Sequence, residues 1–315
     1  MTGATGFAGS HLLEQLIETE PTVAAWSNPR NPRLDGSPQS DAARSRTRWT
    51  AVDLTDRAAV LQAIEALRPS VVYHCAGAAD VAASWTEPAR TLKLNALSTH
   101  YLLDAVHRTG LTCPVVVTGS AAIYRPSPDP LREDSPIEPS SPYGFSKLAQ
   151  EMVAARAAST PVFLARAFNH AGPRQSPAYV TSSFARQIAE IEAGAGEPVL
   201  QVGNLDARRD VTDVRDTVRA YRMLVASGRP SRPYNVCSGR GYQIGDLLDA
   251  LLGLARTKIR VQIDPARLRP ADSAAVIGDP SRIASDVGWR PEIPIDRTLK
   301  DLLDDWRLRV AAPRS

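Results

Sequence analysis

Short apolar runs alternate with amphipathic stretches along the first half of the chain. Four of these runs have the length and β-branched content of buried strands, at residues 22–26, 49–52, 70–73 and 114–117. Between them, apolar residues recur at helical spacing over residues 57–67 and 88–107. Because strand and helix alternate, the pattern predicts a doubly wound α/β fold, a parallel sheet covered by helices on both faces.

The pattern loosens in the second half of the chain. A further helix is predicted over residues 143–158 and a further strand over 162–165, but after about Asn169 the elements become short and are broken by Gly and Pro. We therefore expect a first domain over residues 1–168 and a smaller region over residues 169–315 that is interleaved with the sheet. Residues 28–48, rich in Pro, Arg, Ser and Asp, are expected to form a long loop.

A glycine-rich segment opens the chain. Gly3, Gly6 and Gly9 are spaced G-x-x-G-x-x-G and precede an amphipathic helical pattern over residues 10–17. Glycine allows a tight turn and a close backbone approach to a pyrophosphate, and the helix N-terminus attracts the phosphates. The loop, including Phe7 and Ala8, is therefore predicted to bind a dinucleotide in a Rossmann domain.

The strand that should precede this loop is not evident in the sequence. Met1 is followed at once by Thr2 and Gly3, where a Rossmann sheet normally has its first and central strand. We therefore expect the first strand to be missing. Our hypothesis is that the chain was shortened at its start, or that its start codon was placed too far downstream.

Cofactor preference is predicted from the end of the second strand. An NAD-binding site usually has an acidic residue there, but residues 25–30 contain none. Arg30, with Ser27 or Asn28, could instead pair with a 2′-phosphate, and Arg33 is a reserve candidate. The sequence thus favours NADP(H) over NAD(H).

Two later strand ends complete the predicted cofactor site. Asp53 and Leu54 follow the third strand and are expected to contact the adenine. The small residues Cys75, Ala76 and Gly77 follow the next strand and leave the cofactor room.

A hydroxyl and a Tyr–Lys pair come next along the chain. Tyr143 and Lys147 are four residues apart, so a helix carries both on one face. A lysine ammonium beside a phenol favours the phenolate and is expected to lower the pKa of Tyr143. Ser120, just after Thr118, lies at a strand end where it could hydrogen-bond a substrate carbonyl. Ser120, Tyr143 and Lys147 are the predicted catalytic residues.

Composition excludes several other classes of protein. The formal net charge of +3 gives no case for nucleic acid binding, and no segment is long and apolar enough to span a membrane. The three cysteines are isolated, and neither they nor the histidines have the spacing of metal ligands. We expect a cytoplasmic enzyme without a metal.

The sequence resembles the extended short-chain dehydrogenases/reductases over essentially its whole length. The matching residues are the glycine loop, Asp53, Cys75-Ala76-Gly77, Asn95, Ser120 and the segment Ser141-Pro-Tyr-Gly-Phe-Ser-Lys147. The resemblance implies that Ser120 and Tyr143 contact the reacting sugar oxygen and that Lys147 holds the cofactor ribose. It also implies that Asn95 helps to organise the active site. Asn95 and Thr118 are both expected to lie near the cofactor.

The second half resembles the nucleotide-sugar branch and, within it, the proteins that act on GDP-mannose. Asn169 matches the position that contacts the diphosphate-sugar. Arg209 lies in a stretch that is similar to one shared by these dehydratases and reductases. Arg269 and Asp272 match an Arg-Pro-x-acid element, in which the arginine holds the diphosphate and the acid a ribose hydroxyl. A planar guanidinium and a carboxylate suit those partners.

One departure from the dehydratase pattern bears on the reaction. Dehydratases carry a proton-transferring carboxylate where this sequence has Ala121 and Ala122, and alanine cannot transfer protons. The resemblance therefore implies a GDP-4-keto-6-deoxy-D-mannose reductase that uses NADPH to make GDP-D-rhamnose. A nucleotide-sugar 4-epimerase, a 4,6-dehydratase and a catalytically silent NADP-binding regulator stay open as alternatives.

The resemblance also implies a homodimer. Extended relatives commonly pair through two helices of each subunit, here the one over residues 95–107 and the one that starts at Tyr143.

Overall fold

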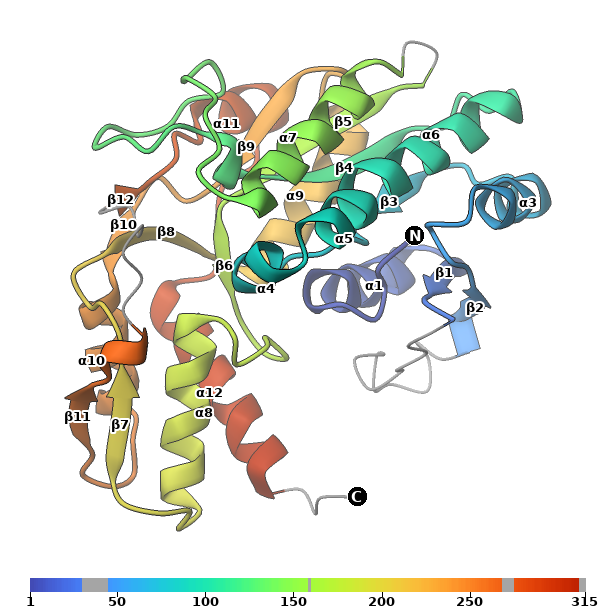
Figure 1. Cartoon of the computed structure of the whole chain (residues 1–315). Coiled ribbons are helices and arrows are strands. Elements are labelled where there is room, and N and C mark those ends of the chain that lie inside the picture. The colour runs from blue at the N-terminus through green and yellow to red at the C-terminus, as the bar shows by residue number, and fades with distance from the viewer. Residues whose placement is uncertain (30–44, 158–159, 268–274, 312–315) are drawn as a thin grey trace.

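The computed structural model describes residues 1–29, 45–157, 160–267 and 275–311, and Figure 1 shows a parallel sheet between helices beside a smaller group of elements. The doubly wound α/β fold is thereby confirmed. In spatial order, the strands of the main sheet are β2 (Thr47–Ala51), β1 (Val23–Ser27), β3 (Val72–His74), β4 (Val115–Ser120), β5 (Val162–Ala167) and β9 (Pro233–Val236). Every pairing between neighbouring strands within this sheet is parallel.

The first residues of the chain join the two parts of this sheet. Thr2 forms parallel bridges with Trp26 of β1 and with His74 of β3. The Trp26 amide donates to the Met1 carbonyl at 2.9 Å, and the Thr2 amide donates to the Tyr73 carbonyl at 2.9 Å. Met1 and Thr2 therefore lie at the position of the first strand, but Thr2 makes only isolated bridges, so the described residues contain no full strand before the glycine loop, as expected. The strand order reverses at this position, where doubly wound sheets bind their ligands.

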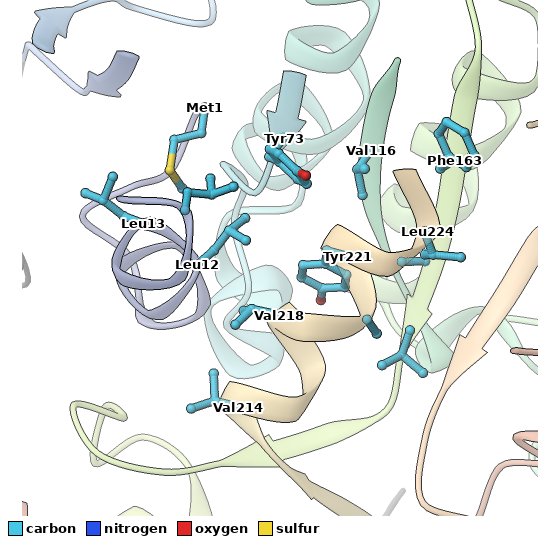
Figure 2. Close-up of a cluster of buried hydrophobic side chains, with 14 of the residues drawn as sticks. Met1, Leu12, Leu13, Tyr73, Val116, Phe163, Val214, Val218, Tyr221 and Leu224 are labelled. Atoms are coloured by element: carbon cyan, nitrogen blue, oxygen red, sulfur yellow. The ribbon is translucent and has the colours of Figure 1, made fainter. Parts of the chain in front are cut away.

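Three helices pack on each face of the main sheet. One face carries α1 (Phe7–Thr19), α9 (Val214–Ser227) and α11 (Ser281–Val287). Figure 2 shows apolar side chains of α1 and α9 in one cluster with Tyr73, Val116 and Phe163. The other face carries α3 (Arg57–Leu67), α6 (Ser98–Arg108) and α7 (Pro142–Ala155). Because the centre of the sheet is buried on both faces, β4 and β5 begin with runs of consecutive buried apolar residues, at 115–117 and 162–165, rather than with an alternating pattern.

The smaller group of elements has its own core. Its strands form one sheet of β6 (Asn169–Ala171), β8 (Arg208–Asp213), β10 (Gly241–Gln243) and β12 (Ala275–Val276), and a second of β7 (Val199–Val202) and β11 (Arg260–Ile263). Apolar side chains from these strands pack against three helices, namely α8 (Val180–Glu192), α10 (Ile244–Gly253) and α12 (Ile295–Ala311). None of the helices in the described ranges combines the length and apolar character that a membrane span requires.

The predicted helix over residues 88–107 is the clearest local difference from the sequence-based expectation. Its sequence forms α5 (Pro88–Leu92), a π-helical turn (Lys93–Leu97) and α6. A π turn inserts one residue into the helical register and is often found at functional sites. This turn contains Asn95, whose side chain is fully buried. The predicted helix over residues 57–67 coincides with α3, and α7 begins at Pro142 and ends at Ala155 rather than at residue 158.

Core packing between the sheet and α6 predicts a large penalty for Leu102→Ala. Leu102 is fully buried among side chains of α3, β3 and β4. We expect the substitution to lower the free energy of unfolding by about 2–5 kcal/mol, since the cavity adds to the lost transfer energy. Urea denaturation followed by circular dichroism measures this change. Leu308→Ala on α12, where the side chain is 74% exposed, is the matched control and should change it by less than about 0.5 kcal/mol.

Candidate active site

The glycine loop is built by close backbone contacts. Gly3 has a φ of +69°, a left-handed conformation that favours glycine. A Cβ atom on Gly9 would lie 1.9 Å from the Gly3 carbonyl oxygen, so no side chain fits there. Gly6 caps α1 without any side-chain hydrogen bond and is itself exposed. The first amides of α1, at Phe7 and Ala8, therefore form a bare helix N-terminus suited to a diphosphate.

The loop after β3 lies directly against the glycine loop. A Cβ on Gly3 would be 2.6 Å from the Ala76 amide nitrogen and 2.7 Å from the Cys75 carbonyl carbon. A Cβ on Gly77 would lie 2.5 Å from the Asn95 Oδ1 atom and 3.8 Å from the Lys147 Nζ atom. Small residues are thus required here because two backbone segments and two functional side chains converge.

Asp53 and Leu54 follow β2 at the entrance to α3. The Asp53 carboxylate accepts hydrogen bonds from the Thr55 amide at 2.9 Å and from the Thr55 hydroxyl at 2.7 Å. This carboxylate therefore holds the turn, and its contact with adenine stays a prediction. Arg30 and Arg33 lie outside the described residues, as do Arg269 and Asp272 of the predicted substrate site.

Ser120 and Tyr143 are brought together by the end of β4 and the start of α7. The Ser141 hydroxyl accepts from the Gly144 amide at 3.1 Å, and Pro142 takes the first helical position. This cap places Tyr143 in the first turn of α7, close enough to Ser120 for the serine side chain to lower the pKa of the phenol. The Ser120 hydroxyl also accepts from the Ala122 amide at 3.1 Å, which fixes its oxygen at the strand end.

Lys147 lies one turn further along α7. Its ammonium donates to the Thr118 carbonyl at 2.9 Å and to Gln150 Oε1 at 2.9 Å, and it lies 6.0 Å from the centre of the Tyr143 ring. Burial lowers the pKa of Lys147 to about 8, an effect that the nearby Cys75 thiol opposes. The side chain is 6% exposed, so a charged group is held here in a largely desolvated place.

The ionisation of Tyr143 differs from the sequence-based prediction. Burial raises the pKa of Tyr143 above its ordinary value, and only the hydrogen bond with Ser120 opposes this effect. The predicted lowering by Lys147 is therefore corrected, because the ammonium is turned toward Thr118 and Gln150 and burial is the main influence on the phenol. A phenol with a raised pKa stays protonated at neutral pH and is equipped to donate a proton.

Asn95 ties the loop after β3 to the start of α7. Its Oδ1 accepts from the Ala78 amide at 2.8 Å, and its Nδ2 donates to the Ala78 carbonyl at 3.0 Å and to the Ser146 hydroxyl at 2.8 Å. Ser146 in turn donates to the Tyr143 carbonyl at 2.7 Å. The amide of Asn95 thus sets the distance between the cofactor loop and the helix that carries Tyr143.

The predicted substrate residues that are described lie on the smaller sheet. Asn169 is exposed on β6 and pairs with Val211 of β8. Arg209 is two residues before Val211, so the register puts Asn169 and Arg209 on the same face of that sheet. The Arg209 guanidinium donates to the Arg208 carbonyl at 2.9 Å. The chain returns to this sheet at β12, directly after the segment that contains Arg269 and Asp272.

Several polar residues near the site were not singled out by the sequence analysis. Tyr179, just before α8, donates from its hydroxyl to the Ala79 carbonyl at 3.1 Å. Burial raises the pKa of Tyr179 to about 12, and the proximity of Tyr143 adds to this rise. Gln150 was also missed, although its position three residues after Lys147 puts both on one face of α7. The buried residues Thr2, His74 and Thr99 carry no sequence signal that distinguishes them from core residues.

A parallel sheet with a glycine loop at its switch point, combined with the Ser120, Tyr143 and Lys147 arrangement, defines an extended short-chain dehydrogenase/reductase. Within this class, the chain belongs to the GDP-mannose 4,6 dehydratase family, which matches residues 1–302.

Comparison with known proteins supports this assignment over nearly the whole chain. GDP-6-deoxy-D-mannose reductase from Pseudomonas aeruginosa is 33% identical, over 98% of this chain and 97% of that protein. A solved structure of RMD from Pseudomonas aeruginosa, complexed with NADPH, has a TM-score of 0.82 at 31% identity and covers 98% of this chain and 97% of its own. UDP-glucose 4-epimerase from Thermus thermophilus, complexed with NAD, has a TM-score of 0.84 at 28% identity, with 97% of each chain covered.

The contact between Gly9 and Gly3 predicts a specific binding defect. In Gly9→Ala, the added methyl group cannot coexist with the Gly3 carbonyl, so the loop must move away from the phosphate position. We expect the affinity for NADPH to fall at least about tenfold, which is about 1.4 kcal/mol, in a fluorescence titration. Gly253→Ala is the matched control, since a Cβ there meets nothing within 4 Å. Equal affinity in both variants would contradict the assignment of the loop.

Proposed function

We propose that the chain is an NADPH-dependent reductase that converts GDP-4-keto-6-deoxy-D-mannose to GDP-D-rhamnose. The observation that carries the proposal is the grouping of three side chains: Ser120 at the end of β4, Tyr143 in the first turn of α7, and Lys147 with its Nζ 6.0 Å from the centre of the Tyr143 ring. Two alanines, Ala121 and Ala122, follow Ser120. The 33% identity to GDP-6-deoxy-D-mannose reductase, over almost the full length of both chains, supports the choice of substrate. The likeness to RMD in complex with NADPH supports the choice of cofactor.

The residues present fit a dinucleotide. A Cβ at Gly3 or Gly9 would strike the backbone that shapes the glycine loop, so the tight turn beside the helix N-terminus depends on glycine. The bare N-terminus of α1 would hold the diphosphate, Lys147 the nicotinamide ribose and Asp53 with Leu54 the adenine. We assign the 2′-phosphate to Arg30. NADPH, when bound, supplies the hydride that reduces C4 of the sugar.

The proton in this reduction comes from Tyr143. The Ser120 hydroxyl orients the C4 carbonyl oxygen and stabilises the negative charge that develops on it. Tyr143, protonated at neutral pH because its pKa is raised, donates its proton to that oxygen. The positive charge of Lys147 then stabilises the phenolate that remains, at a distance of 6.0 Å from the ring centre. Ala121 and Ala122 offer no group to remove a proton from C5, so elimination of water has no base at this position.

Residues 169–315 would mainly bind the nucleotide-sugar. Asn169 and Arg209, on one face of the β6–β8 sheet, are proposed to contact the sugar diphosphate. Arg269 is assigned to the diphosphate and Asp272 to a ribose hydroxyl of the same ligand. Tyr179, tied to Ala79 and close to Tyr143, would form the wall of the site nearest to the reacting sugar.

The reductase activity is tested by the absorbance of NADPH with GDP-4-keto-6-deoxy-D-mannose, made in place from GDP-mannose by a separate dehydratase. We expect stoichiometric oxidation of NADPH and a lower kcat/KM with NADH. In Tyr143→Phe, kcat should fall at least about a hundredfold while the Kd for NADPH stays within about twofold, because the proton donor is lost and the glycine loop is kept. Tyr101→Phe on α6 is the matched control and should retain activity.

The competing functions give other results in the same assay. An epimerase recycles its bound cofactor and would change the sugar without net oxidation of NADPH. A dehydratase would release a keto-sugar from GDP-mannose without the added dehydratase. A silent NADP-binding regulator would bind NADPH but turn over no sugar, in both the wild-type protein and Tyr143→Phe. Any of these outcomes would reject the proposed reductase.

We also propose a cytoplasmic location and a homodimer. Cys75, Cys113 and Cys237 are unpaired, as is usual where thiols are kept reduced. Large apolar side chains are exposed on one group of helices that lie side by side in Figure 1, namely Trp85 on α4 (Val81–Thr86), Leu92 on α5, and Phe145 and Met152 on α7. A second copy of the chain that pairs through this face would cover them.

The dimer proposal predicts that a charge in this face separates the subunits. Met152 is 62% exposed, so Met152→Lys should not disturb the fold of a single subunit. Two-fold symmetry repeats each substitution in the interface, and we expect the dimer Kd to rise at least about tenfold. Sedimentation velocity should show twice the chain mass of 34.0 kDa for the wild-type protein and a shift toward the monomer for the variant. Leu308→Lys, away from this face, should remain dimeric, and a wild-type monomer would refute the proposal.

A further inference from the structure

A chain of buried hydrogen bonds leads from Lys147 to the residue before the glycine loop. Lys147 Nζ donates to Gln150 Oε1 at 2.9 Å, and Gln150 Nε2 donates to the Thr99 hydroxyl at 2.9 Å. The Thr99 hydroxyl is also 2.9 Å from His74 Nε2, and His74 Nδ1 is 2.8 Å from the Thr2 hydroxyl. These side chains come from α7, α6, β3 and the start of the chain, and each is no more than 6% exposed.

The proton of the Thr99 hydroxyl determines which group donates and which accepts in each of these hydrogen bonds. The Thr99 hydroxyl donates its only hydrogen to the backbone carbonyl of Asn95 at 2.7 Å, since a carbonyl can only accept. Both other partners of that oxygen must then donate to it, so Gln150 presents its amide nitrogen and His74 its protonated Nε2. The reverse orientation of Gln150 would turn an amide N–H toward the Lys147 ammonium, and two donors cannot bond each other.

His74 completes the chain as a neutral ring. Burial, together with the ammonium groups of Lys147 and Met1, lowers the pKa of His74 to about 3. With its proton on Nε2, the ring accepts from the Thr2 hydroxyl at Nδ1. The Thr2 oxygen in turn accepts from the Ala76 amide at 3.2 Å, in the loop that lies against Gly3. These hydrogen bonds therefore connect Lys147 to the backbone of Ala76, beside the glycine loop, and the donor and acceptor of each bond are defined.

Two of the three Lys147 protons are engaged in this arrangement. One goes to the Thr118 carbonyl and one to Gln150 Oε1. An ammonium with two fixed acceptors has one remaining N–H direction, and Gly77 lies beside this ammonium, since a Cβ on Gly77 would be 3.8 Å from Nζ. The titratable groups that face Lys147 are Tyr143 on its own helix and His74 with Cys75 at the end of β3.

We propose that Gln150 is a positioning residue for Lys147, and that Thr99 and neutral His74 hold Gln150 in the orientation this role requires. This proposal rests on the proposed function, because that function gives Lys147 its catalytic role. Gln150 fixes one N–H direction beside the one that the Thr118 carbonyl fixes. It thereby directs the third toward the ribose position and keeps the ammonium charged in a desolvated place. A residue that acted only by packing α7 against α6 would have no effect on the ionisation of Lys147.

The test follows Lys147 directly in protein prepared without cofactor. The chain has four lysines, and Lys93, Lys258 and Lys300 are exposed, so ¹³Cε-lysine NMR resolves the buried one. Wild-type Lys147 should titrate near pH 8. In Gln150→Leu the charged form loses an acceptor, and the titration should move down by about one pH unit. In Gln150→Glu, which keeps the shape of the side chain, a carboxylate should move it up by about one pH unit.

The pH dependence of kcat is a second readout, and it should shift in opposite directions in Gln150→Glu and Gln150→Leu. A raised pKa of Lys147 preserves its charge to higher pH, so the alkaline fall in kcat should occur at higher pH in Gln150→Glu and at lower pH in Gln150→Leu. Thr99→Val, which frees Gln150 to rotate, should shift both readouts in the same direction as Gln150→Leu, and by less. Gln62→Leu on α3, where the side chain is exposed, is the control and should shift neither.

The outcomes separate this inference from the proposed function. An unchanged Lys147 titration in both Gln150 variants, or a shift of the same sign in both, would overturn the positioning role. If Gln150→Leu fails to fold, Gln150→Glu alone decides, and only an upward shift supports the role. Opposite shifts in a protein that does not reduce the GDP-linked keto-sugar would support the positioning role while rejecting the substrate.

Discussion

The backbone of Gly3 lies so close to that of Cys75 and Ala76 that no side chain fits between them. This contact makes the loop after β3 the common support of the site. Thr2 binds the Ala76 amide, Asn95 binds both backbone groups of Ala78, and Tyr179 binds the Ala79 carbonyl. Elements from the start of the chain, from the π turn and from the smaller group of elements therefore all meet on four consecutive residues.

The contacts on this loop explain how a buried ammonium and a partly buried phenol are held beside each other. A desolvated ammonium and a desolvated phenol are each destabilised in their charged forms, so Lys147 holds its proton less firmly and Tyr143 more firmly than in water. A backbone oxygen and an amide oxygen replace water around the ammonium, and the Ser120 side chain partly offsets the rise in the pKa of the phenol. The protein thus provides a proton donor and a nearby positive charge at neutral pH, which are the requirements of carbonyl reduction.

Sequence patterns predicted the main sheet and its helices, because these depend on apolar periodicity. Ser120, Tyr143 and Lys147, predicted as catalytic residues from their spacing and their place at a strand end, are brought together in the structure. Three features could not be read in this way. The pairing of Met1 and Thr2 with β1 and β3 depends on contacts between distant segments. The direction of the shift in the Tyr143 pKa depends on burial, which residue spacing alone does not reveal. The roles of His74 and Thr99 depend on which groups face them across the sheet, since both have the sequence context of ordinary core residues.

The π turn at Lys93–Leu97 has a consequence for how chain length can vary in proteins of this kind. The extra residue in the turn sets the rotation of α6 relative to α5, and with it the direction of Asn95 and Thr99. Loss of a single residue there would restore the ordinary helical register and rotate everything that follows by about 100°. The exposed turn at Gly194 and Gly196 is different, because positions for added Cβ atoms meet nothing within 4 Å. Insertions and deletions should therefore accumulate freely at that turn during divergence, while the number of residues between Pro88 and Arg108 stays constant.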